Sequence, residues 1–353
     1  MKKVLITPLD WGLGHATRCI PIIRELISRG CSVSIGGSGD SLTLLRNEFP
    51  SLSFFDLPGY NPVYPSSGSM VWKMASQLSK FRKVIRDEHD AVERISHENK
   101  IDLIISDNRY GCWSEKIPCV FISHQTNILM PKRFGWLASM VRYLTSRMIN
   151  RFDYCCIPDY PDHRSLGGQL VEFGNDSIKA KVLYMGSLSR FKPSASREKK
   201  FDVLCILSGP EPQRSMLEKV MMDQLPSSGL KYLIVRGLLS SSVVKDEQIV
   251  DFLATEKLQE AIEQSEVIIA RSGFSTVMDL ATLGKRAIFI PTPGQTEQEY
   301  LADTLMKKRI IFSMTQDQFD LPTAWEESKK YTGFKFPHYH DDLLKKALNE
   351  ILS

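Results

Sequence analysis

Short runs of apolar, β-branched residues alternate along this chain with longer stretches in which apolar residues recur at helical spacing. In the first half the runs that are typical of strands cover residues 4–8, 32–36, 53–57, 102–106, 119–123, 154–158 and 182–185. Strands that alternate with helices and are apolar on both faces predict a parallel sheet with helices on two sides. The first half is therefore predicted to be an α/β, doubly wound, Rossmann-like domain.

The same alternation restarts in the second half of the chain. Strands are predicted at 202–207, 231–235, 267–270, 287–291 and 310–313, with helices that begin near residues 213, 257, 276, 298 and 340. The two halves are joined by a polar, Ser- and Lys-rich link around residues 187–200. We expect one Rossmann-like domain over 1–190, a second over 200–338, and a helix over 339–353 that would pack back on the first. Two such domains predict a ligand cleft between the carboxyl ends of both sheets.

Composition fits this two-domain prediction and narrows the class of protein. The 353 residues exceed the length that one hydrophobic core usually serves, and 42% hydrophobic with 24% charged residues is ordinary for a soluble protein. Residues 1–190 carry 24 basic and 18 acidic side chains, whereas the rest carries 21 and 23. This excess is compatible with a solvated surface, an acidic acceptor or an anionic membrane, and it is too modest to predict a nucleic-acid partner.

Location and redox state follow from three further features. The seven cysteines form no metal-ligand spacing and no disulfide framework, which is typical of reduced thiols. The amino-terminal apolar run ends at Asp10 and predicts a strand and not a signal peptide. No apolar stretch reaches the roughly 18–20 residues of a membrane span. We expect a cytoplasmic protein, with the inner face of the membrane as an alternative, and no metal cofactor.

A glycine-containing loop follows the first predicted strand and leads into a helix. Gly12 and Gly14 allow close approach of a ligand to the backbone, and the helix start favours negative charge. The loop is a poor dinucleotide fingerprint, because Thr17 stands where a third glycine belongs and the second strand ends without a carboxylate. The sequence therefore predicts an anion-binding loop without NAD, and Gly14 is a candidate donor contact.

His15 in this loop is the candidate catalytic base. An imidazole at the end of the first strand titrates near the pH at which a base is useful, and a carboxylate on its second nitrogen would improve it. Asp107 ends another strand of the same domain and is the candidate partner, while Asp10 is a second candidate. Structural interpretations stay open: a capping role for His15 and a turn or cap role for Asp107. His124, at a further strand end, is a candidate acceptor contact or a structural histidine.

In the second domain, a strand ends in a turn of small residues at the start of a helix. The hydroxyl and backbone donors that suit a diphosphate there are those of Ser272, Gly273, Ser275 and Thr276. Asp279, about one turn later, is positioned for the two ribose hydroxyls. An ordinary capped helix with an acid near its start is the structural alternative.

Two neighbouring loops strengthen the prediction of a ligand site. After the strand 287–291, Gln298 and Glu299 enter a helix and offer paired donors and acceptors to sugar hydroxyls. After the first strand of this domain, Ser208 and Gly209 form a small-residue turn that is followed by Arg214. Three loops of this kind are expected to meet at one edge of the sheet.

The pattern Arg-Ser-Gly-x-x-Thr-x-x-Asp, followed by Gln-x-x-Gln-Glu-Tyr-x-Ala, resembles the donor site of UDP-glycosyltransferases with the two-Rossmann GT-B fold. It is closest to the group that includes the GlcNAc transferase of lipid II synthesis. The likeness extends to the loop around His15 and to the Asp107 strand, so it covers most of the chain. This sequence departs from that group at two positions. The group usually carries Glu where Asp279 stands, which shortens the reach to the ribose, and Gln where Glu299 stands, which concerns the identity of the sugar.

The resemblance implies inverting transfer of a hexose or N-acetylhexosamine from a UDP-sugar to a hydroxyl of a cell-envelope, lipid-linked or glycan acceptor. Ser208, Gly209 and the loop at Ser272 would hold the diphosphate, and Arg214 or Arg271 would stabilise the leaving group without a metal. The alternatives are a nucleotide-sugar hydrolase of the pseudaminic-acid pathway type, an epimerase on the same fold and a non-catalytic nucleotide-sugar-binding protein.

A predicted helix over residues 132–151 carries an apolar stripe at 137, 140, 141, 144 and 148 beside three arginines. This pattern is typical of an interfacial helix at an anionic membrane. It is also typical of a helix that faces the core and carries a basic outer face, and the sequence leaves both open.

Overall fold

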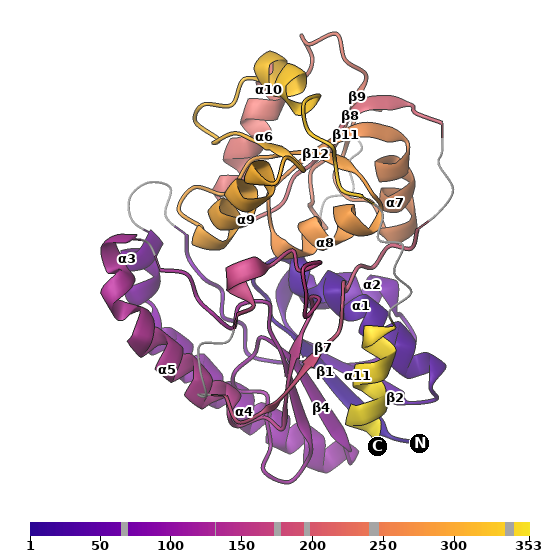
Figure 1. The fold of residues 1–353 in the computed structure, drawn as a ribbon. Helices are drawn as coiled ribbons and strands as arrows, with labels where there is room; N and C mark the ends of the chain where they lie inside the picture. The colour runs from indigo at the N-terminus through magenta and orange to yellow at the C-terminus, as the bar shows by residue number, and fades with distance from the viewer. Residues whose placement is uncertain (65–69, 131, 173–177, 194–197, 240–246, 336–341) are drawn as a thin grey trace. The chain divides into compact units, whose positions relative to one another are not determined.

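The computed structural model contains two compact α/β units, which we describe separately (Figure 1). The residues described are 1–64, 70–130, 132–172, 178–193, 198–239, 247–335 and 342–353. The first unit comprises residues 1–62, 74–188 and 340–353, and the second comprises 63–73 and 189–339. The chain thus enters the second unit twice. The predicted boundary near residue 190 assigned residues 63–73 to the first domain, whereas the structure groups them with the second unit.

A parallel seven-stranded sheet forms the centre of the first unit. Its strands are β1 (Lys3–Pro8), β2 (Ser32–Gly37), β3 (Ser53–Asp56), β4 (Leu103–Asp107), β5 (Cys119–Ile122), β6 (Tyr154–Ile157) and β7 (Lys181–Tyr184). They lie in the order β3-β2-β1-β4-β5-β6-β7, and Pro8 is paired in register with Asp107. The ends of β1 and β4 therefore lie side by side, which brings the loop around His15 next to Asp107.

Helices cover this sheet. They are α1 (Leu13–Ser28), α2 (Gly39–Glu48), α4 (Leu78–Asn99), α5 (Ala138–Ile149) and α11 (Leu343–Leu352), with short 3₁₀ turns at Lys132–Leu137 and Gly168–Leu170. The short helix α3 (Met70–Ala75) lies where the chain returns from the second unit to the first. Of the described helices, none is both long enough and apolar enough to cross a bilayer.

The surface of α5 disagrees with one of the two interpretations left open by the sequence, the one in which its apolar stripe faces the core. Met140 and Leu144 are exposed, while Thr145, Ser146 and Ile149 are the residues that α5 buries. The face of the helix that packs on the core is therefore about a third of a turn away from the stripe. Two of the five stripe residues are exposed, and the other three are half-buried.

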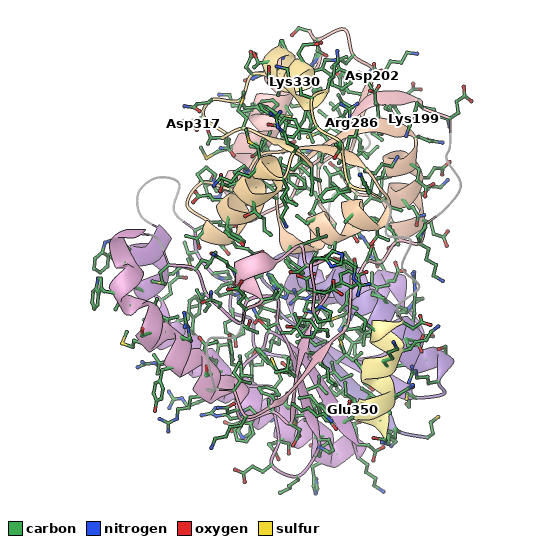
Figure 2. All side chains as sticks on the ribbon, in the orientation of Figure 1. Lys199, Asp202, Arg286, Asp317, Lys330 and Glu350 are labelled. Atoms are coloured by element: carbon green, nitrogen blue, oxygen red, sulfur yellow. The ribbon has the colours of Figure 1, made fainter. Side chains whose placement is uncertain are left out.

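Helix α11 is part of the first unit although it follows the whole second unit in sequence. It packs beside β7 and buries Leu348 and Ile351. On the side of α1, Arg29 donates hydrogen bonds to the side chain of Asn349 and to the carbonyl of Lys345. Glu350, which is labelled in Figure 2, forms an ion pair with Lys181 of β7.

The second unit contains a parallel six-stranded sheet. Its strands are β8 (Phe201–Ile206), β9 (Tyr232–Val235), β10 (Ile249–Val250), β11 (Ser265–Ala270), β12 (Arg286–Phe289) and β13 (Phe312–Ser313), in the order β10-β9-β8-β11-β12-β13. The helices are α6 (Gln213–Gln224), α7 (Thr255–Glu263), α8 (Phe274–Thr282), α9 (Thr296–Lys307) and α10 (Leu321–Ser328). Both sheets have the strand order of doubly wound folds, which confirms the predicted α/β class with two Rossmann-like sheets.

Two elements of the second unit were not predicted. β10 contains two residues and pairs with β9 through Ile249 and Val250. Two residues are too few to show the alternation of apolar and polar positions that predicts a strand. α10 begins with an Asp320 cap that accepts a hydrogen bond from the Thr323 backbone. Neither element changes the sheet edge that carries the predicted site residues.

Candidate active site

The loop after β1 turns sharply into α1 at Gly12. This residue has φ of 87°, a left-handed conformation that an L side chain rarely adopts, and it lies at the cap position of α1. The Thr17 hydroxyl donates to the carbonyl of Gly14 at 3.0 Å and stabilises the first turn. The turn places His15 in the first turn of α1, where its side chain remains 12% exposed.

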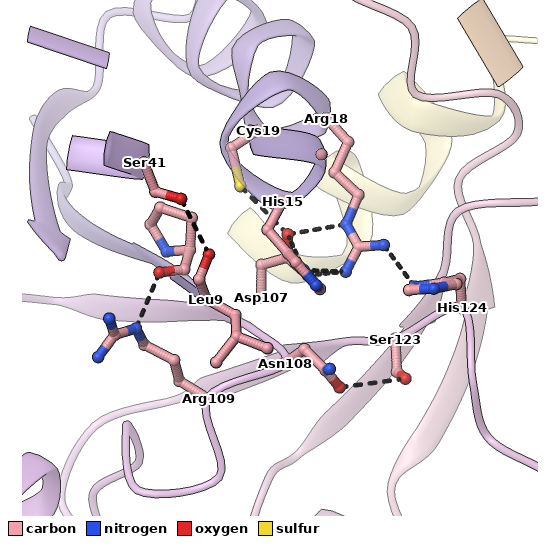
Figure 3. Close-up of polar contacts among 12 residues, drawn as sticks. Leu9, His15, Arg18, Cys19, Ser41, Asp107, Asn108, Arg109, Ser123 and His124 are labelled. Carbon is pink, nitrogen blue, oxygen red and sulfur yellow. Dashed lines mark hydrogen bonds and ion pairs between the residues drawn. The ribbon is translucent and has the colours of Figure 1, made fainter. Parts of the chain in front are cut away.

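One buried guanidinium, that of Arg18, joins the three residues predicted to act in this unit (Figure 3). Its Nε donates to Asp107 Oδ2 at 2.7 Å, and its Nη2 donates to Asp107 Oδ1. The same Nη2 lies 2.8 Å from Nδ1 of His15, and Nη1 lies 2.5 Å from Nδ1 of His124. The predicted neighbours are therefore brought together by an arginine that was not assigned a role. Spacing along α1 places Arg18 on the same helical face as His15, three residues earlier, but it does not report the contact with Asp107 that buries the guanidinium.

The contact with Arg18 defines which nitrogen of His15 carries a proton. A guanidinium only donates hydrogen bonds, so Nδ1 of a neutral His15 accepts and the ring proton lies on Nε2. Asp107 Oδ2 is 3.4 Å from the same Nδ1, longer than an ordinary hydrogen bond. The predicted pair of His15 and Asp107 is thus adjacent, but Arg18 holds the nitrogen that Asp107 was expected to orient.

The protonation of these groups follows from burial and from Arg18. Burial, and then the charge of Arg18, lower the pKa of His15, while Asp107 opposes this shift. Burial alone would raise the pKa of Asp107, but Arg18 and His15 outweigh it and hold this pKa well below its usual range. The thiol of Cys19 lies 3.6 Å from Asp107, and burial raises its pKa. At neutral pH the cluster is therefore a carboxylate, a guanidinium and a neutral imidazole.

Asp10, the second candidate partner of His15, belongs to a different buried cluster. Its Oδ2 accepts from the Ser38 hydroxyl and from the backbone N–H of Tyr60, and Oδ1 lies 3.7 Å from Arg109. Arg109 is fully buried and donates to Glu88 at 2.6 Å. The prediction of Asp10 as a partner for His15 is therefore wrong, because its carboxylate holds the loops after β1, β2 and β3 together.

His124 follows β5 and is buried against Arg18, with its ring centroid 5.9 Å from that of His15. Its loop is fixed two residues later, where the Thr126 hydroxyl and the Asn127 N–H donate to the carbonyl of Leu170. The arrangement agrees with the structural interpretation of His124, and its contact with an acceptor remains a prediction.

In the second unit, Arg271 connects three loops at the carboxyl ends of the strands. It directly follows β11, is 1% exposed and donates to the carbonyls of Ile290 and Pro291 at 3.1 Å and of Gln213 at 2.8 Å. A further hydrogen bond reaches Gln316 Oε1 at 2.5 Å. Burial lowers the pKa of Arg271 to about 10. Because these loops enclose the guanidinium of Arg271, the structure disagrees with the predicted direct contact between Arg271 and the leaving group. Arg271 instead sets the spacing of the loops.

The turn after Arg271 leads into α8 as predicted. Gly273 is the cap residue, and Ser275 and Thr276 lie half-buried in the first turn. Ser272 is fully buried, and its hydroxyl donates to the carbonyl of Gln298 at 2.7 Å. The side chains of Ser275 and Thr276 therefore lie at the half-buried start of the helix, whereas the Ser272 hydroxyl joins this turn to α9.

Asp279 lies six residues into α8, where its carboxylate is buried. The Ser189 hydroxyl donates to Oδ1 at 2.6 Å, and Arg190 Nε lies 3.8 Å from Oδ2. Burial raises the pKa of Asp279, although Arg190 and Ser189 oppose the shift. A contact with ribose hydroxyls remains a prediction that requires Ser189 to be displaced or to share the carboxylate.

The loop after β12 is held by the two residues predicted to bind the sugar. Oε1 of Gln298 accepts from the Thr292 N–H at 2.8 Å, and Oε1 of Glu299 accepts from the Gly294 N–H at 2.9 Å. A Cβ added at Gly209, whose φ is 104°, would lie 3.8 Å from the Thr292 hydroxyl. The loop with Ser208 and Gly209 and the loop after β12 are thus neighbours, as the sequence predicted.

Arg214 is occupied by two acidic side chains, one just before α6 and one within it. It donates to Glu211 at 2.6 Å and to Glu218 at 2.7 Å and is largely buried. Its charge is compensated locally, so the predicted role beside the leaving group disagrees with this geometry. Within the described ranges, no three His, Cys, Asp or Glu side chains are grouped so as to hold a metal ion.

A family model and several relatives of known sequence resemble this chain. Residues 238–327 match the model of the glycosyltransferase family 28 C-terminal domain, a segment that contains β11, α8, β12 and α9. An uncharacterized glycosyltransferase of Methanosarcina acetivorans is 26% identical over 325 residues, which cover 84% of this chain and 81% of that protein. A UDP-N-acetylglucosamine–N-acetylmuramyl-(pentapeptide) pyrophosphoryl-undecaprenol N-acetylglucosamine transferase of Wigglesworthia glossinidia brevipalpis is 21% identical over 326 residues, covering 87% and 82%.

Among solved structures, MurG of Acinetobacter baumannii superposes with a TM-score of 0.58 at 13% identity and covers 100% of this chain and 99% of its own. At this low sequence identity the superposition supports a shared fold and nothing more. The matched domain, the two parallel sheets and the relatives together support a glycosyltransferase of GT-B fold that resembles the group containing the lipid II GlcNAc transferase.

Proposed function

We propose that the chain transfers a hexose or N-acetylhexosamine from a UDP-sugar to a hydroxyl of a cell-envelope, lipid-linked or glycan acceptor, with inversion and without a metal ion. The observation that carries the proposal is the match of residues 238–327 to a glycosyltransferase domain, because this segment contains Arg271 and the loops after β11 and β12 that form the predicted donor site. Uridine as the base follows from the resemblance.

The second unit would bind the donor at the start of α8. Ser275 and Thr276 carry half-buried hydroxyls in the first turn, where the positive end of the helix dipole favours an anion. This arrangement suits a diphosphate, whose charge grows as the sugar departs. Gln298 and Glu299 would orient the sugar by way of the loop that they hold.

The first unit would supply His15 as the base. In the proposed step the acceptor hydroxyl gives its proton to Nε2 of His15, and its oxygen forms a bond to the anomeric carbon. The bond from that carbon to the diphosphate oxygen breaks, and the electron pair leaves with UDP. The step requires a lone pair on Nε2 and places the imidazolium beside the Asp107 carboxylate.

A panel of nucleotide sugars tests the donor, since a ligand that binds the native state raises the melting temperature. With the best ligand, we expect UDP release only when an acceptor extract is added. Release of free sugar without an acceptor would instead identify a hydrolase, and binding without turnover in any extract would identify a non-catalytic binder.

A variant and a matched control test the donor site itself. Thr276→Val should raise the donor KM about tenfold, the loss expected for one hydrogen bond to a charged group. Thr282→Val, at the other end of α8, should leave KM unchanged. Equal effects of the two variants would contradict the assignment of the helix start to the diphosphate.

We also propose that the exposed face of α5 contacts an anionic membrane that presents the acceptor. On α5, Tyr143 is 63% exposed and lies on one helical face with Met140 and Leu144, and Trp136 in the 3₁₀ turn directly before α5 is 78% exposed. Arg147 is exposed on the same face. Aromatic and apolar side chains beside a cation are typical of helices that lie in the membrane interface.

Flotation with vesicles that contain phosphatidylglycerol at low salt tests this contact. The wild-type protein should float, and the double variant Trp136→Ser, Met140→Ser should remain in solution. Met216→Ser, which removes an exposed apolar side chain elsewhere, is the control. A wild-type protein that fails to float, or a double variant that floats equally well, would remove the membrane proposal.

A further inference from the structure

We infer that Arg18 is a positioning residue that determines which ring nitrogen of His15 carries the proton, and thereby whether Nε2 donates or accepts a hydrogen bond. In the arrangement described, Arg18 holds His15 in the Nε2–H form, which cannot accept a proton from a hydroxyl. The consequence for catalysis rests on the proposed function, whereas the tautomer itself does not.

The inference starts from two competing partners for one atom. Nδ1 of His15 lies 2.8 Å from a nitrogen of Arg18, which only donates, and 3.4 Å from an oxygen of Asp107, which as a carboxylate only accepts. A neutral imidazole has one ring proton. If Nδ1 bonds to Arg18, that proton lies on Nε2; if Nδ1 bonds to Asp107, the proton lies on Nδ1 and Nε2 has the lone pair.

Arg18 is the fixed member of this arrangement. Two of its nitrogens bond to Asp107 and a third bonds to His124, and the whole side chain is buried. His15 retains exposure at the start of α1, so its ring is the part that can rotate. Closing the distance to Asp107 by about half an ångström would reach an ordinary hydrogen bond, so the two tautomers are separated by a small movement.

The groups facing the ring explain why the neutral form is the relevant one. They are Arg18 from α1, Asp107 from the end of β4, His124 after β5 and the Cys19 thiol beside Asp107. Burial and Arg18 disfavour the imidazolium, so the choice between two neutral tautomers decides what Nε2 offers to a ligand.

A ligand can shift this choice because it binds the two tautomers differently. An acceptor hydroxyl that donates to Nε2 selects the Nδ1–H form, in which Asp107 replaces Arg18 as the partner and His15 becomes the base. A ligand oxyanion selects the Nε2–H form. The free protein therefore keeps the base in its inactive tautomer, and the acceptor hydroxyl itself favours the active one.

Two-bond ¹H–¹⁵N NMR of the ¹⁵N-histidine protein without substrate reads the tautomer of each ring directly. The expected wild-type result is Nε2–H for His15 and for His124, both of which accept from Arg18 through Nδ1. His89 is an internal reference for the opposite tautomer, since its Nδ1 lies 3.1 Å from the Trp113 carbonyl, which only accepts. His15→Gln and His124→Gln assign the signals. A wild-type His15 in the Nδ1–H form overturns the inference. Apart from the two variants that assign the signals, this measurement uses only the wild-type protein.

Two substitutions should move the His15 signal in different ways. Arg18→Lys keeps a positive charge but lacks the fork that reaches Asp107 and both histidines, and it should shift His15 toward Nδ1–H. Asp107→Asn removes the competing carboxylate and should leave His15 as Nε2–H. The His89 signal should remain unchanged in both proteins, and its movement would indicate a general change of the fold. An unchanged His15 tautomer in folded Arg18→Lys would contradict the role of Arg18.

Kinetics then separate this inference from the proposed function. Once a donor and an acceptor are known, Arg18→Lys should change kcat by at least about threefold and should alter the pH dependence of kcat. The donor KM should remain unaltered. Absence of any glycosyl transfer would refute the proposed function while leaving the tautomer result intact.

Discussion

At the scale of single residues, the charges around Asp107 determine how the first unit responds to substitution and to acid. Asp107 is fully buried and compensates the guanidinium of Arg18. Asp107→Ala leaves that guanidinium buried and unpaired, so we expect the free energy of unfolding at pH 7 to fall by about 3–5 kcal/mol. Urea unfolding measures the loss.

Asp303→Asn breaks an exposed ion pair with Lys307 and is the control for this prediction, with an expected change below about 0.5 kcal/mol. Because the pKa of Asp107 is lowered in the folded state, its contribution is present above about pH 4 and is lost as the pH falls further. The wild-type protein should therefore lose stability in acid more steeply than Asp107→Asn, and parallel curves would contradict the assigned pKa direction.

His15 also makes the protein less stable as the pH falls, but at a higher pH than Asp107. Its pKa is lowered in the folded state, so below about pH 6.5 the unfolded chain binds a proton that the native protein does not. We expect the wild-type free energy of unfolding to decline between about pH 6.5 and 5, and His15→Gln to show a shallower decline. Urea unfolding over this interval measures the difference, and a steeper decline in the variant would show that the pKa of His15 is raised instead.

Part of this cluster was predictable from sequence. Strand ends predicted that His15 and Asp107 would be neighbours, because parallel strands bring their carboxyl ends to one edge. The role of Arg18 was missed, because an arginine in the second turn of an amphipathic helix is ordinarily a surface residue. Its burial depends on Asp107, 89 positions away, and no local pattern reports such a partner.

At the scale of elements, the three loops of the second unit depend on one side chain. Arg271→Lys keeps the charge but cannot span the carbonyls of Gln213, Ile290 and Pro291. We expect a loss of about 1.5–3 kcal/mol in the free energy of unfolding, equal to one hydrogen bond with a charged donor. Urea unfolding measures it, and hydrogen exchange should rise in residues 290–294.

Arg309→Lys is the matched control for this prediction, because Arg309 is exposed in the same unit and its replacement should change stability by less than about 0.5 kcal/mol. Exchange that rises equally throughout the second unit would indicate global destabilisation and not a local clamp. The loops themselves were predictable from their small residues, whereas the clamp was not, since Arg271 was expected to face the ligand.

At the scale of the whole molecule, the first unit is assembled from separated parts of the chain. Leu348 of α11 is fully buried in it. Leu348→Ala should lower the free energy of unfolding of the first unit by about 2–4 kcal/mol, the range for a buried leucine. Hydrogen exchange resolved by unit measures the loss, and the second unit should be unaffected.

Lys346→Ala, on the exposed side of α11, is the control and should have little effect. Equal loss in both units would show that α11 does not stabilise the first unit selectively. Two α/β sheets were predictable from the alternation of strands and helices. The assignment of residues 63–73 to the second unit was not, because it depends on contacts across distant parts of the sequence.

The position of α11 also has a consequence for biosynthesis. Domains generally fold one after another as the chain leaves the ribosome, with the amino-terminal one first. Here the first unit lacks the helix beside β7 until all of residues 189–339 have been synthesised. A nascent chain of about 190 residues would expose the apolar side of β7, so we expect it to bind chaperones, and the second unit would be the first to complete its core.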